Sequence, residues 1–360
     1  MHLGLEATAA CRPVKTGIAR YAHNLMAALV AEGREQGIRY TAFASLSRRW
    51  KKGWQFDPID GLHWRWYAGM SPILRDAPKL IHGLEMRVPR VPGAARVATV
   101  HDLFGLLPGN LLPEKACKRN AVRYSAMAKN CDQIIANSEC TAADFLRFFD
   151  YPADRVHVVP LAVDASFQPR SQEEHADVQQ RLGLEGPYLL YVGDLTPRKN
   201  LLRLLQAFAA SQASRDHTLV IAGARSDGAD ELSAAIEACP SRDSVRVLGW
   251  TPDEDLRLLY SGAAALLFPS LYEGFGLPIL EAFASGTPAL GGDAGAVPGI
   301  AGGHATLVDP KDVDSIIAGI DKVLNTPTEQ VEAARKYAAG FTWKRCAQET
   351  MAVYRQALRI

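Results

Sequence analysis

Several features that would place the chain in a membrane or outside the cell are missing from the sequence. No run of about 18 apolar residues is present, so no membrane-spanning helix is predicted. The first residues lack the basic start and continuous apolar core of a signal peptide, and instead predict a short strand at 2–7. The six cysteines include no C-x-x-C pair, which favours reduced thiols over a zinc site or a disulfide framework. We therefore expect a cytoplasmic protein, either free or attached to the inner face of the membrane.

The sequence has almost no net charge, but its positive and negative residues are unevenly distributed. The formal net charge of the 360 residues is only +1. Residues 1–168 contain 22 Lys and Arg against 15 Asp and Glu (+7), and residues 169–360 contain 18 against 24 (−6). The basic half could face an anionic partner such as nucleic acid or a phosphorylated lipid, or the asymmetry could be ordinary scatter of surface charge.

Short apolar runs alternate with amphipathic stretches along the whole chain, a pattern typical of βαβ units. Strands are predicted at 2–7, 96–100, 133–136, 156–159, 188–192, 218–222, 245–248, 264–268, 288–290 and 305–308. The polar, charged segment 164–186 is interpreted as a domain junction. The prediction is an α/β protein with two doubly wound parallel-sheet domains, 1–168 and 169–342, that face each other across a cleft. Ligands of such sheets lie beyond the carboxyl ends of the strands.

The segment 269–288 carries the densest set of candidate binding residues. A strand is predicted to end at residue 268, and a helix to begin near Leu277 with a proline in its first turn. Gly274 and Gly276 allow a ligand to approach the main chain, and the helix N-terminus favours phosphate. The carboxylates of Glu273 and Glu281 can accept paired hydrogen bonds from vicinal hydroxyl groups. For either glutamate taken alone, the alternative to ligand binding is a carboxylate that caps main-chain amides or faces water.

A second motif, P-R-K-N, follows the predicted strand 188–192. Arg198 and Lys199 could neutralise a diphosphate there, although solvated loop cations are the usual fate of an isolated Arg-Lys pair.

These motifs resemble a known family of enzymes. Four motifs, taken together, are similar to those of the large retaining glycosyltransferase family 4. They are the run E-G-F-G-L-P-x-L-E, the P-R-K-N motif, His101-Asp102 after one N-terminal strand, and Thr16-Gly17 after the first strand. That family has the GT-B fold of two Rossmann-like domains. The resemblance covers essentially the whole chain and is greatest for bacterial mannosyltransferase-like members.

The resemblance implies a role for each matching residue. The expected catalytic residues are His101, Glu273, Arg198 and Lys199. The expected donor-binding residues are Gly17, Arg198, Lys199, Arg225, Trp250, Gly274, Phe275, Gly276, Leu277 and Glu281. Within this set, the two cations would bind the donor diphosphate, Glu281 the ribose and Glu273 the transferred sugar, with the base near 223–225 and 248–250. His101 would contact a sugar hydroxyl, although a lone histidine at a strand end is more often structural.

The same resemblance implies the reaction and its partners. A hexose, mannose from GDP-mannose, would be transferred with retention to a glycan or a lipid-diphosphate-linked acceptor. No metal or other cofactor is expected, because two cations and a helix end supply the positive charge, and the two D-x-D spacings fall at predicted helix starts. Members commonly pack their last helix on the N-terminal domain, so residues 343–360 are expected there.

Two departures from the family pattern are visible. Asp194 stands where Arg is more usual, so Arg198 must supply the second cation. Gly299 follows Pro298 where Glu is more usual, which leaves the local loop contacts in doubt.

The stretch 47–54 mixes cations with indoles, which is the chemistry of a bilayer interface. Peripheral membrane contact is predicted through Arg48, Arg49, Trp50, Lys51, Lys52 and Trp54, with Trp64 and Trp66 nearby. A surface loop whose tryptophans pack on the core is the alternative. No nucleic-acid partner is expected, since no nucleic-acid-binding module is recognisable.

Two other functional classes remain open. The first is a GT-B epimerase or a phosphorylase, although no Schiff-base lysine pocket for a pyridoxal cofactor is recognisable. The second is a catalytically silent sugar-nucleotide-binding subunit, against which the presence of Arg198, Lys199, Glu273 and Glu281 argues.

Overall fold

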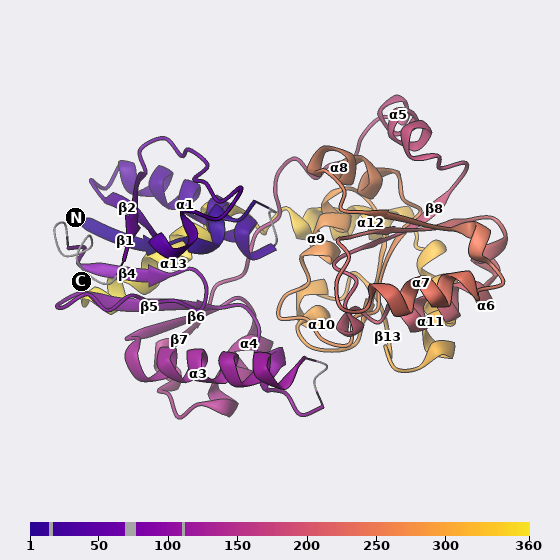
Figure 1. The fold of residues 1–360 in the computed structure, drawn as a ribbon. Coiled ribbons are helices and arrows are strands. Elements are labelled where there is room, and N and C mark those ends of the chain that lie inside the picture. The colour runs from indigo at the N-terminus through magenta and orange to yellow at the C-terminus, as the bar shows by residue number, and fades with distance from the viewer. Residues whose placement is uncertain (14–16, 69–76, 110–111) are drawn as a thin grey trace. The chain divides into compact units, whose positions relative to one another are not determined.

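The computed structural model describes residues 1–13, 17–68, 77–109 and 112–360 (Figure 1). The chain divides into two compact units. Unit 1 contains Met1–Ala162 and Thr342–Ile360, and unit 2 contains Val163–Phe341. The boundary predicted after residue 168 therefore lies inside unit 2. Residues 163–168 belong to unit 2 because Val163 N donates to Phe341 O (3.1 Å) and the Phe167 ring packs edge-on against Tyr260 (5.4 Å).

Seven strands of the described part of unit 1 form a parallel sheet in the order β3-β2-β1-β4-β5-β6-β7. Their bounds are β1 (His2–Glu6), β2 (Arg39–Ser45), β3 (His63–Tyr67), β4 (Leu80–Gly83), β5 (Ala95–Val100), β6 (Gln133–Ala136) and β7 (Val156–Val158). The helices discussed below are η2 (Leu46–Arg48), η3 (Phe104–Leu106), α1 (Gly17–Arg34), α3 (Glu114–Asn130), α4 (Glu139–Phe148) and α13 (Trp343–Leu358).

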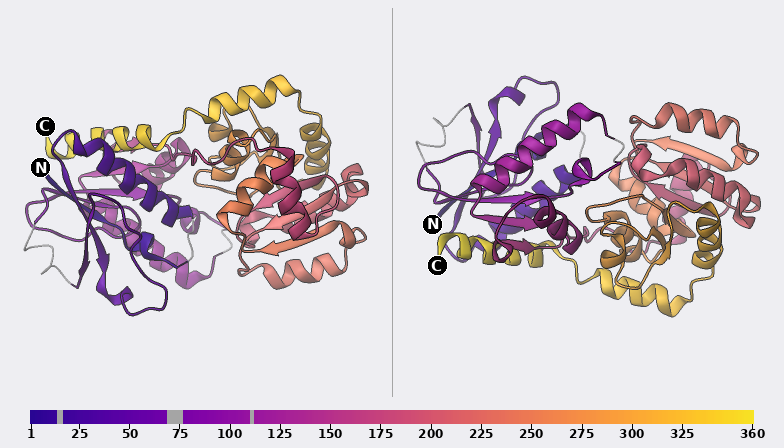
Figure 2. Two further views of the ribbon diagram at one scale, coloured as in Figure 1. Left: turned by 90° about the horizontal axis from the view of Figure 1, so that it is seen from above. Right: turned by 90° about the horizontal axis from the view of Figure 1, so that it is seen from below.

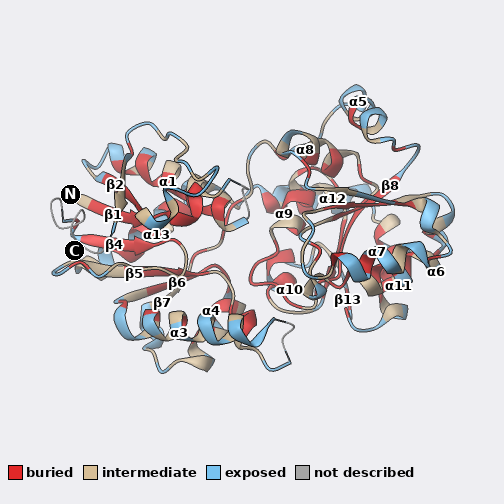
Figure 3. Ribbon diagram, viewed as in Figure 1, coloured by how far each residue is buried: buried red, intermediate tan, exposed pale blue. Residues whose placement is uncertain are grey.

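Helices cover both faces of this sheet, as the burial of strand residues on both sides requires (Figure 3). On one face, Tyr124 and Met127 of α3 and Phe145 of α4 pack on strand residues that include Val100 and Ile134. On the other face lie α1 and α13, which run side by side (Figure 2). The last helix of the chain is thus part of unit 1.

A buried chain of hydrogen bonds fixes α1 and α13 to the sheet. The His82 ring lies between the hydroxyls of Tyr354 on α13 (2.6 Å) and Thr99 on β5 (2.8 Å). Thr99 also contacts the hydroxyl of Tyr21 on α1 (2.8 Å). Burial lowers the pKa of His82 to about 3, so the ring is neutral at physiological pH.

Six strands of the described part of unit 2 form a second parallel sheet, in the order β10-β9-β8-β11-β12-β13. Their bounds are β8 (Tyr188–Val192), β9 (Thr218–Ala222), β10 (Val245–Gly249), β11 (Ala265–Phe268), β12 (Ala289–Gly292) and β13 (Thr306–Val308). The helices are α5 (Gln172–Leu182), α6 (Leu201–Ala210), α7 (Ala229–Glu237), α8 (Asp253–Gly262), α9 (Leu277–Ala284), α10 (Val297–Ala301), α11 (Val313–Leu324) and α12 (Thr328–Ala338), with η5 (Pro197–Lys199) between β8 and α6.

One local detail differs from the sequence-based prediction. The charged part of the predicted junction forms α5, because Ser171 and Glu174 build a reciprocal capping box and Gly183 ends the helix in the left-handed conformation (φ 63°). The start of α4 is capped by Ser138, whose side chain accepts from Thr141 N.

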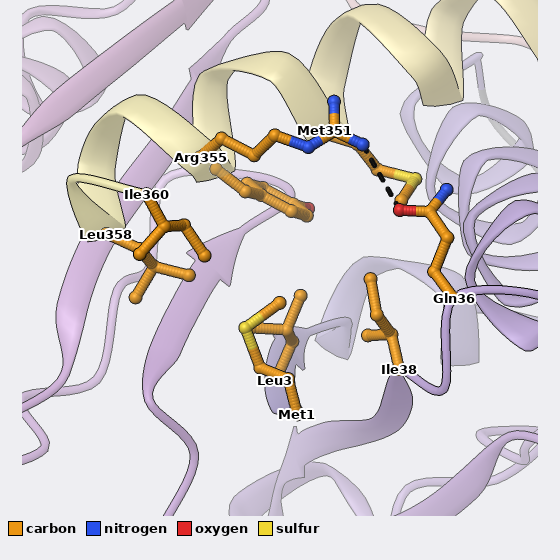
Figure 4. A pocket seen from close by; sticks show the side chains of 9 residues that line it. Met1, Leu3, Gln36, Ile38, Met351, Arg355, Leu358 and Ile360 are labelled. Atoms are coloured by element: carbon orange, nitrogen blue, oxygen red, sulfur yellow. Dashed lines mark hydrogen bonds between the residues drawn. The ribbon is translucent and has the colours of Figure 1, made fainter.

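A cavity of about 280 Å³ lies at the amino-end edge of the unit 1 sheet (Figure 4). It is lined by residues that include Met1, Leu3, Ile38 and Met351, and Arg355 donates to Gln36 Oε1 across one side (3.1 Å). The predicted ligand residues of unit 1 follow the opposite, carboxyl ends of the strands. This cavity is therefore separate from them. Among the described residues, no helix has the length and apolar character needed to cross a membrane.

Candidate functional site

The predicted donor residues meet at the switch point of the unit 2 sheet. The strand order runs from β8 outward to β10 in one direction and from β11 to β13 in the other, so β8 and β11 are neighbours from which the chain diverges. Arg198 and Lys199 follow β8, and Glu273 follows β11. Doubly wound sheets bind ligands beyond the carboxyl ends of such a strand pair.

Hydrogen bonds tie the loops after β8 and β11 together. Leu271 N donates to Arg198 O (2.9 Å). The buried Asn200 side chain donates to Pro269 O (3.0 Å) and Pro310 O (2.5 Å). Asn200 adopts the left-handed conformation (φ 63°) between η5 and α6, which an asparagine tolerates better than most residues. The loop that carries the two cations is therefore held in one position relative to the β11 loop.

Both cations pair with the same carboxylate. Arg198 Nη1 donates to Glu273 Oε2 (2.8 Å) and to Tyr272 O (2.6 Å), and Lys199 Nζ donates to Glu273 Oε1 (2.7 Å). Lys199 Nζ also lies 4.8 Å from the centroid of the Phe268 ring. The side chains of Arg198, Lys199 and Glu273 are 22%, 12% and 9% exposed. The structure thus brings together three of the predicted catalytic residues in a nearly dry cluster of formal charge +1.

Burial and pairing act in opposite directions on this cluster. Burial raises the pKa of Glu273, but the charges of Lys199 and Arg198 outweigh it and hold the pKa at about 2. Burial lowers the pKa of Lys199, and Glu273 opposes that shift. Glu273 is therefore ionised at neutral pH. It holds the two cations in place, and each of its oxygens can accept a further hydrogen bond.

The turn from Glu273 into α9 depends on two glycines. Gly276 precedes the helix with φ 105°, a conformation that L side chains rarely adopt. A Cβ on Gly295 would lie 2.6 Å from Glu273 O, so only glycine permits this approach to the main chain. The Phe275 side chain is buried against Phe341, which leaves only its main chain for a ligand; Gly274 and Leu277 belong to the same turn.

Glu281 lies on α9 and is only 7% exposed. Tyr260 on α8 donates its hydroxyl to Glu281 Oε2 (2.7 Å). The sequence-based prediction named Glu281 but missed Tyr260, because a tyrosine on an amphipathic helix looks like any other core residue.

The residues predicted near the nucleotide base lie farther along the same sheet edge. Arg225 follows β9, and Trp250 follows β10. Trp250 is 59% exposed, which leaves its indole available for stacking. Arg225 pairs with Asp230 (2.7 Å) at the surface. Gly299, at the departure from the family pattern, lies in α10, and an added Cβ there would meet nothing within 4 Å.

In unit 1, His101 follows β5 and is held from two sides. Its Nε2 contacts Leu84 O (2.9 Å), which fixes the proton on that nitrogen, and its ring lies edge-on to Tyr21 (4.8 Å). Burial lowers the pKa of His101, although Leu84 O, Asp102 and Glu85 oppose the shift. The ring is therefore neutral, with Nδ1 as an acceptor. Gly17 is the first residue of α1 and has open space where a Cβ would be; Thr16 lies outside the described residues.

The two D-x-D spacings lie at helix starts. Asp312 caps α11 by accepting from Asp314 N (3.0 Å), and Asp253 and Asp255 are in the first turn of α8. Within the described ranges, no group of three or more His, Cys, Asp or Glu is placed to hold a metal ion.

The geometry defines an α/β protein in which Arg198 and Lys199 pair with Glu273 at a switch point. Comparisons with known proteins identify its family. Residues 172–341 match the family described as Glycosyl transferases group 1, and residues 15–167 match Glycosyltransferase Family 4. The chain belongs to glycosyltransferase family 4. It is a glycosyltransferase with the GT-B fold, as the motifs predicted.

Individual relatives agree with this assignment. The chain is 33% identical over 290 residues to O-antigen chain mannosyltransferase B of Escherichia coli, which covers 78% of this chain and 76% of that one. It is 33% identical over 241 residues to MMP alpha-(1→4)-mannosyltransferase of Mycolicibacterium hassiacum, covering 64% and 56% of the two chains. Sucrose-phosphate synthase from Thermosynechococcus elongatus has a similar fold, with a TM-score of 0.78, 22% identity and coverage of 99% and 98%.

Proposed function

We propose that the protein transfers mannose from GDP-mannose, with retention of configuration, to a glycan or lipid-linked glycan acceptor. The observation that carries this proposal is the pairing of Arg198 and Lys199 with Glu273 at the unit 2 switch point. The choice of sugar is supported by the two mannosyltransferases to which the chain is 33% identical.

The chemistry of the cluster suits the departure of a nucleoside diphosphate. As the bond between the sugar C1 and the diphosphate oxygen breaks, the sugar gains oxocarbenium character and the diphosphate gains negative charge. Fixed cations interact more strongly with that charge than with the ground state, so Arg198 and Lys199 lower the barrier. Glu281 binds the ribose hydroxyls, and the Nδ1 of His101 accepts from a sugar hydroxyl.

Nucleotide binding tests this proposal directly. Thermal-shift titrations with GDP, UDP, ADP and their sugars should show the largest stabilisation with GDP and GDP-mannose. A ligand present at 100 times its Kd adds about 2.7 kcal/mol to the folded state. No shift with any nucleoside diphosphate would contradict the donor site, and a preference for UDP would contradict only the choice of donor.

We further propose that transfer needs no metal, because Arg198 and Lys199 carry the charge that a metal would otherwise supply. Turnover in excess EDTA should equal turnover without EDTA. The measurement is nucleoside diphosphate release with the same preparation before and after chelation. Loss of activity with EDTA that Mg²⁺ or Mn²⁺ restores would contradict metal independence.

Peripheral membrane attachment is part of the proposal, and the structure narrows the residues that could provide it. Trp50 is 82% exposed and pairs with Arg49, while Arg48 lies over the Trp54 ring (5.2 Å). Trp64 and Trp66 are half-buried in β3 and pack against the Phe56 ring at 4.1 and 4.6 Å, so we leave them out of the proposed membrane-facing surface.

We expect that changing Arg48, Arg49, Lys51 and Lys52 to serine reduces binding to anionic vesicles. Each juxtamembrane cation contributes about 1 kcal/mol near such a surface. Co-sedimentation with phosphatidylglycerol vesicles measures the loss, and GDP affinity should stay the same. The control changes four exposed lysines elsewhere, Lys311, Lys322, Lys336 and Lys344, to serine. Equal vesicle binding by the two variants would favour an ordinary surface loop at 47–54.

A further inference from the structure

Four arginines from three separate segments gather on the carboxyl-end side of the unit 1 sheet. Arg48 ends η2 directly after β2, Arg87 follows β4, and Arg119 and Arg123 lie one turn apart on α3, which comes after β5 and η3. We call this set the arginine cluster. Arg48, Arg87 and Arg123 are half-buried and Arg119 is exposed.

The arginine cluster has little compensating negative charge. Within the described part of the chain, none of the four guanidinium groups forms an ion pair with a carboxylate. The nearby Glu85 pairs with Arg12 (2.5 Å). Glu6, on which the charge of Arg87 acts, is fully buried, and burial raises its pKa to about 7.

The positive charges are close enough to act on one another. Burial lowers the pKa of Arg123, and the charges of Arg87, Arg119 and Arg48 lower it further, while Glu85 opposes them. Arg123 Nη1 has Met86 Sδ as its neighbour (4.0 Å). Like charges four residues apart on a helix, as in Arg119 and Arg123, destabilise it. A bound anion would remove this repulsion.

We propose that the arginine cluster binds a phosphate or diphosphate group of the acceptor. This inference rests on the proposed transferase function and specifies its second substrate. Guanidinium groups form paired, charge-assisted hydrogen bonds to phosphate oxygens, and clusters of them are typical of phosphate recognition. The donor diphosphate is already provided for by Arg198 and Lys199 in unit 2, so the unit 1 cluster serves a different anion.

The position of the arginine cluster supports an acceptor that is lipid-linked. The cluster lies on the ligand-binding side of its sheet, where His101 also lies. Arg48 stacks on Trp54 of the segment 47–54, which carries the exposed Trp50. A lipid diphosphate at a membrane surface would present its phosphates beside such a segment.

The test uses the full chain with its donor site filled. Inorganic diphosphate is titrated calorimetrically into protein that is saturated with GDP. Arg87→Gln/Arg123→Gln should weaken diphosphate binding by roughly 10- to 100-fold, since hydrogen bonds to charged groups are the strong ones. Lys79→Gln/Lys129→Gln is the matched control, because it removes two exposed lysines at the opposite edge of the sheet, before β4 and at the end of α3.

Each outcome decides between the alternatives. If the double variant does not fold, Arg119→Gln replaces it, because this exposed side chain can change without loss of packing, and a several-fold weakening is expected. No diphosphate binding by the parent, or equal binding by parent and variant, overturns the inference. If the double variant loses binding to phosphatidylglycerol vesicles but not to diphosphate, the cluster recognises the bilayer surface and the inference is wrong. Failure of GDP, UDP and ADP alike to bind in the thermal-shift titrations would instead contradict the proposed donor site.

Discussion

Replacing Lys199 by alanine is expected to lower kcat/KM by roughly 10²–10³, the cost of losing one preorganised electrostatic group. Lys199 Nζ is fixed 2.7 Å from Glu273 and its side chain is only 12% exposed, so its charge is poorly screened. The interaction grows as the leaving diphosphate gains charge. The loss should therefore fall mainly on kcat and less on the affinity for the donor.

Steady-state kinetics with varied donor measure this effect, and a melting curve confirms that the variant is folded. Lys322→Ala, on the exposed side of α11, removes the same charge far from the cluster and should have wild-type kinetics. A folded Lys199→Ala variant with unchanged kcat/KM would show that the cluster of Arg198, Lys199 and Glu273 does not stabilise the leaving group.

The sequence was most informative where the fold repeats a simple pattern. The four central strands of unit 2, β8, β9, β11 and β12, are short and almost fully buried, which gives them mostly apolar sequences. All six strands of the unit 2 sheet were predicted close to their observed bounds. The segments of β2, β3 and β4 were missed. β3 is an edge strand with the sequence HWRWY, and its half-buried aromatic and charged residues gave the impression of a membrane-facing segment.

The candidate site was predictable only in part. Adjacent strand ends placed Arg198, Lys199 and Glu273 near one another, because residues after neighbouring parallel strands share a sheet edge. The sequence did not show that both cations would pair with one carboxylate, since that depends on side-chain directions within two loops. The hydrogen bonds of Asn200 and of Tyr260 depend on contacts across 69 and 21 residues of chain, and no local pattern specifies them.

Glu273→Gln is expected to have the largest effect on stability. The substitution keeps the shape of the side chain but leaves Arg198 and Lys199 nearly buried without a compensating charge. Removing one partner from a buried ion pair typically costs about 3–5 kcal/mol. Turnover should also fall, because the two cations then repel each other and lose their fixed positions. The control is Glu254→Gln, an exposed glutamate in the first turn of α8, which should change stability by less than about 0.5 kcal/mol.

The pH dependence of the stability difference between the parent and Glu273→Gln provides an independent test. Pairing lowers the pKa of Glu273 from 4.5 to about 2 in the folded protein. Below about pH 4.5 the unfolded chain takes up a proton that the folded protein does not, so the stabilisation is present at neutral pH and is lost as the pH falls. A shift of this size corresponds to about 3 kcal/mol. Urea unfolding of parent and Glu273→Gln should therefore differ most above pH 5 and converge toward pH 2. A difference that stays constant from pH 7 to pH 3 would mean that Glu273 is not ionised between its two cations.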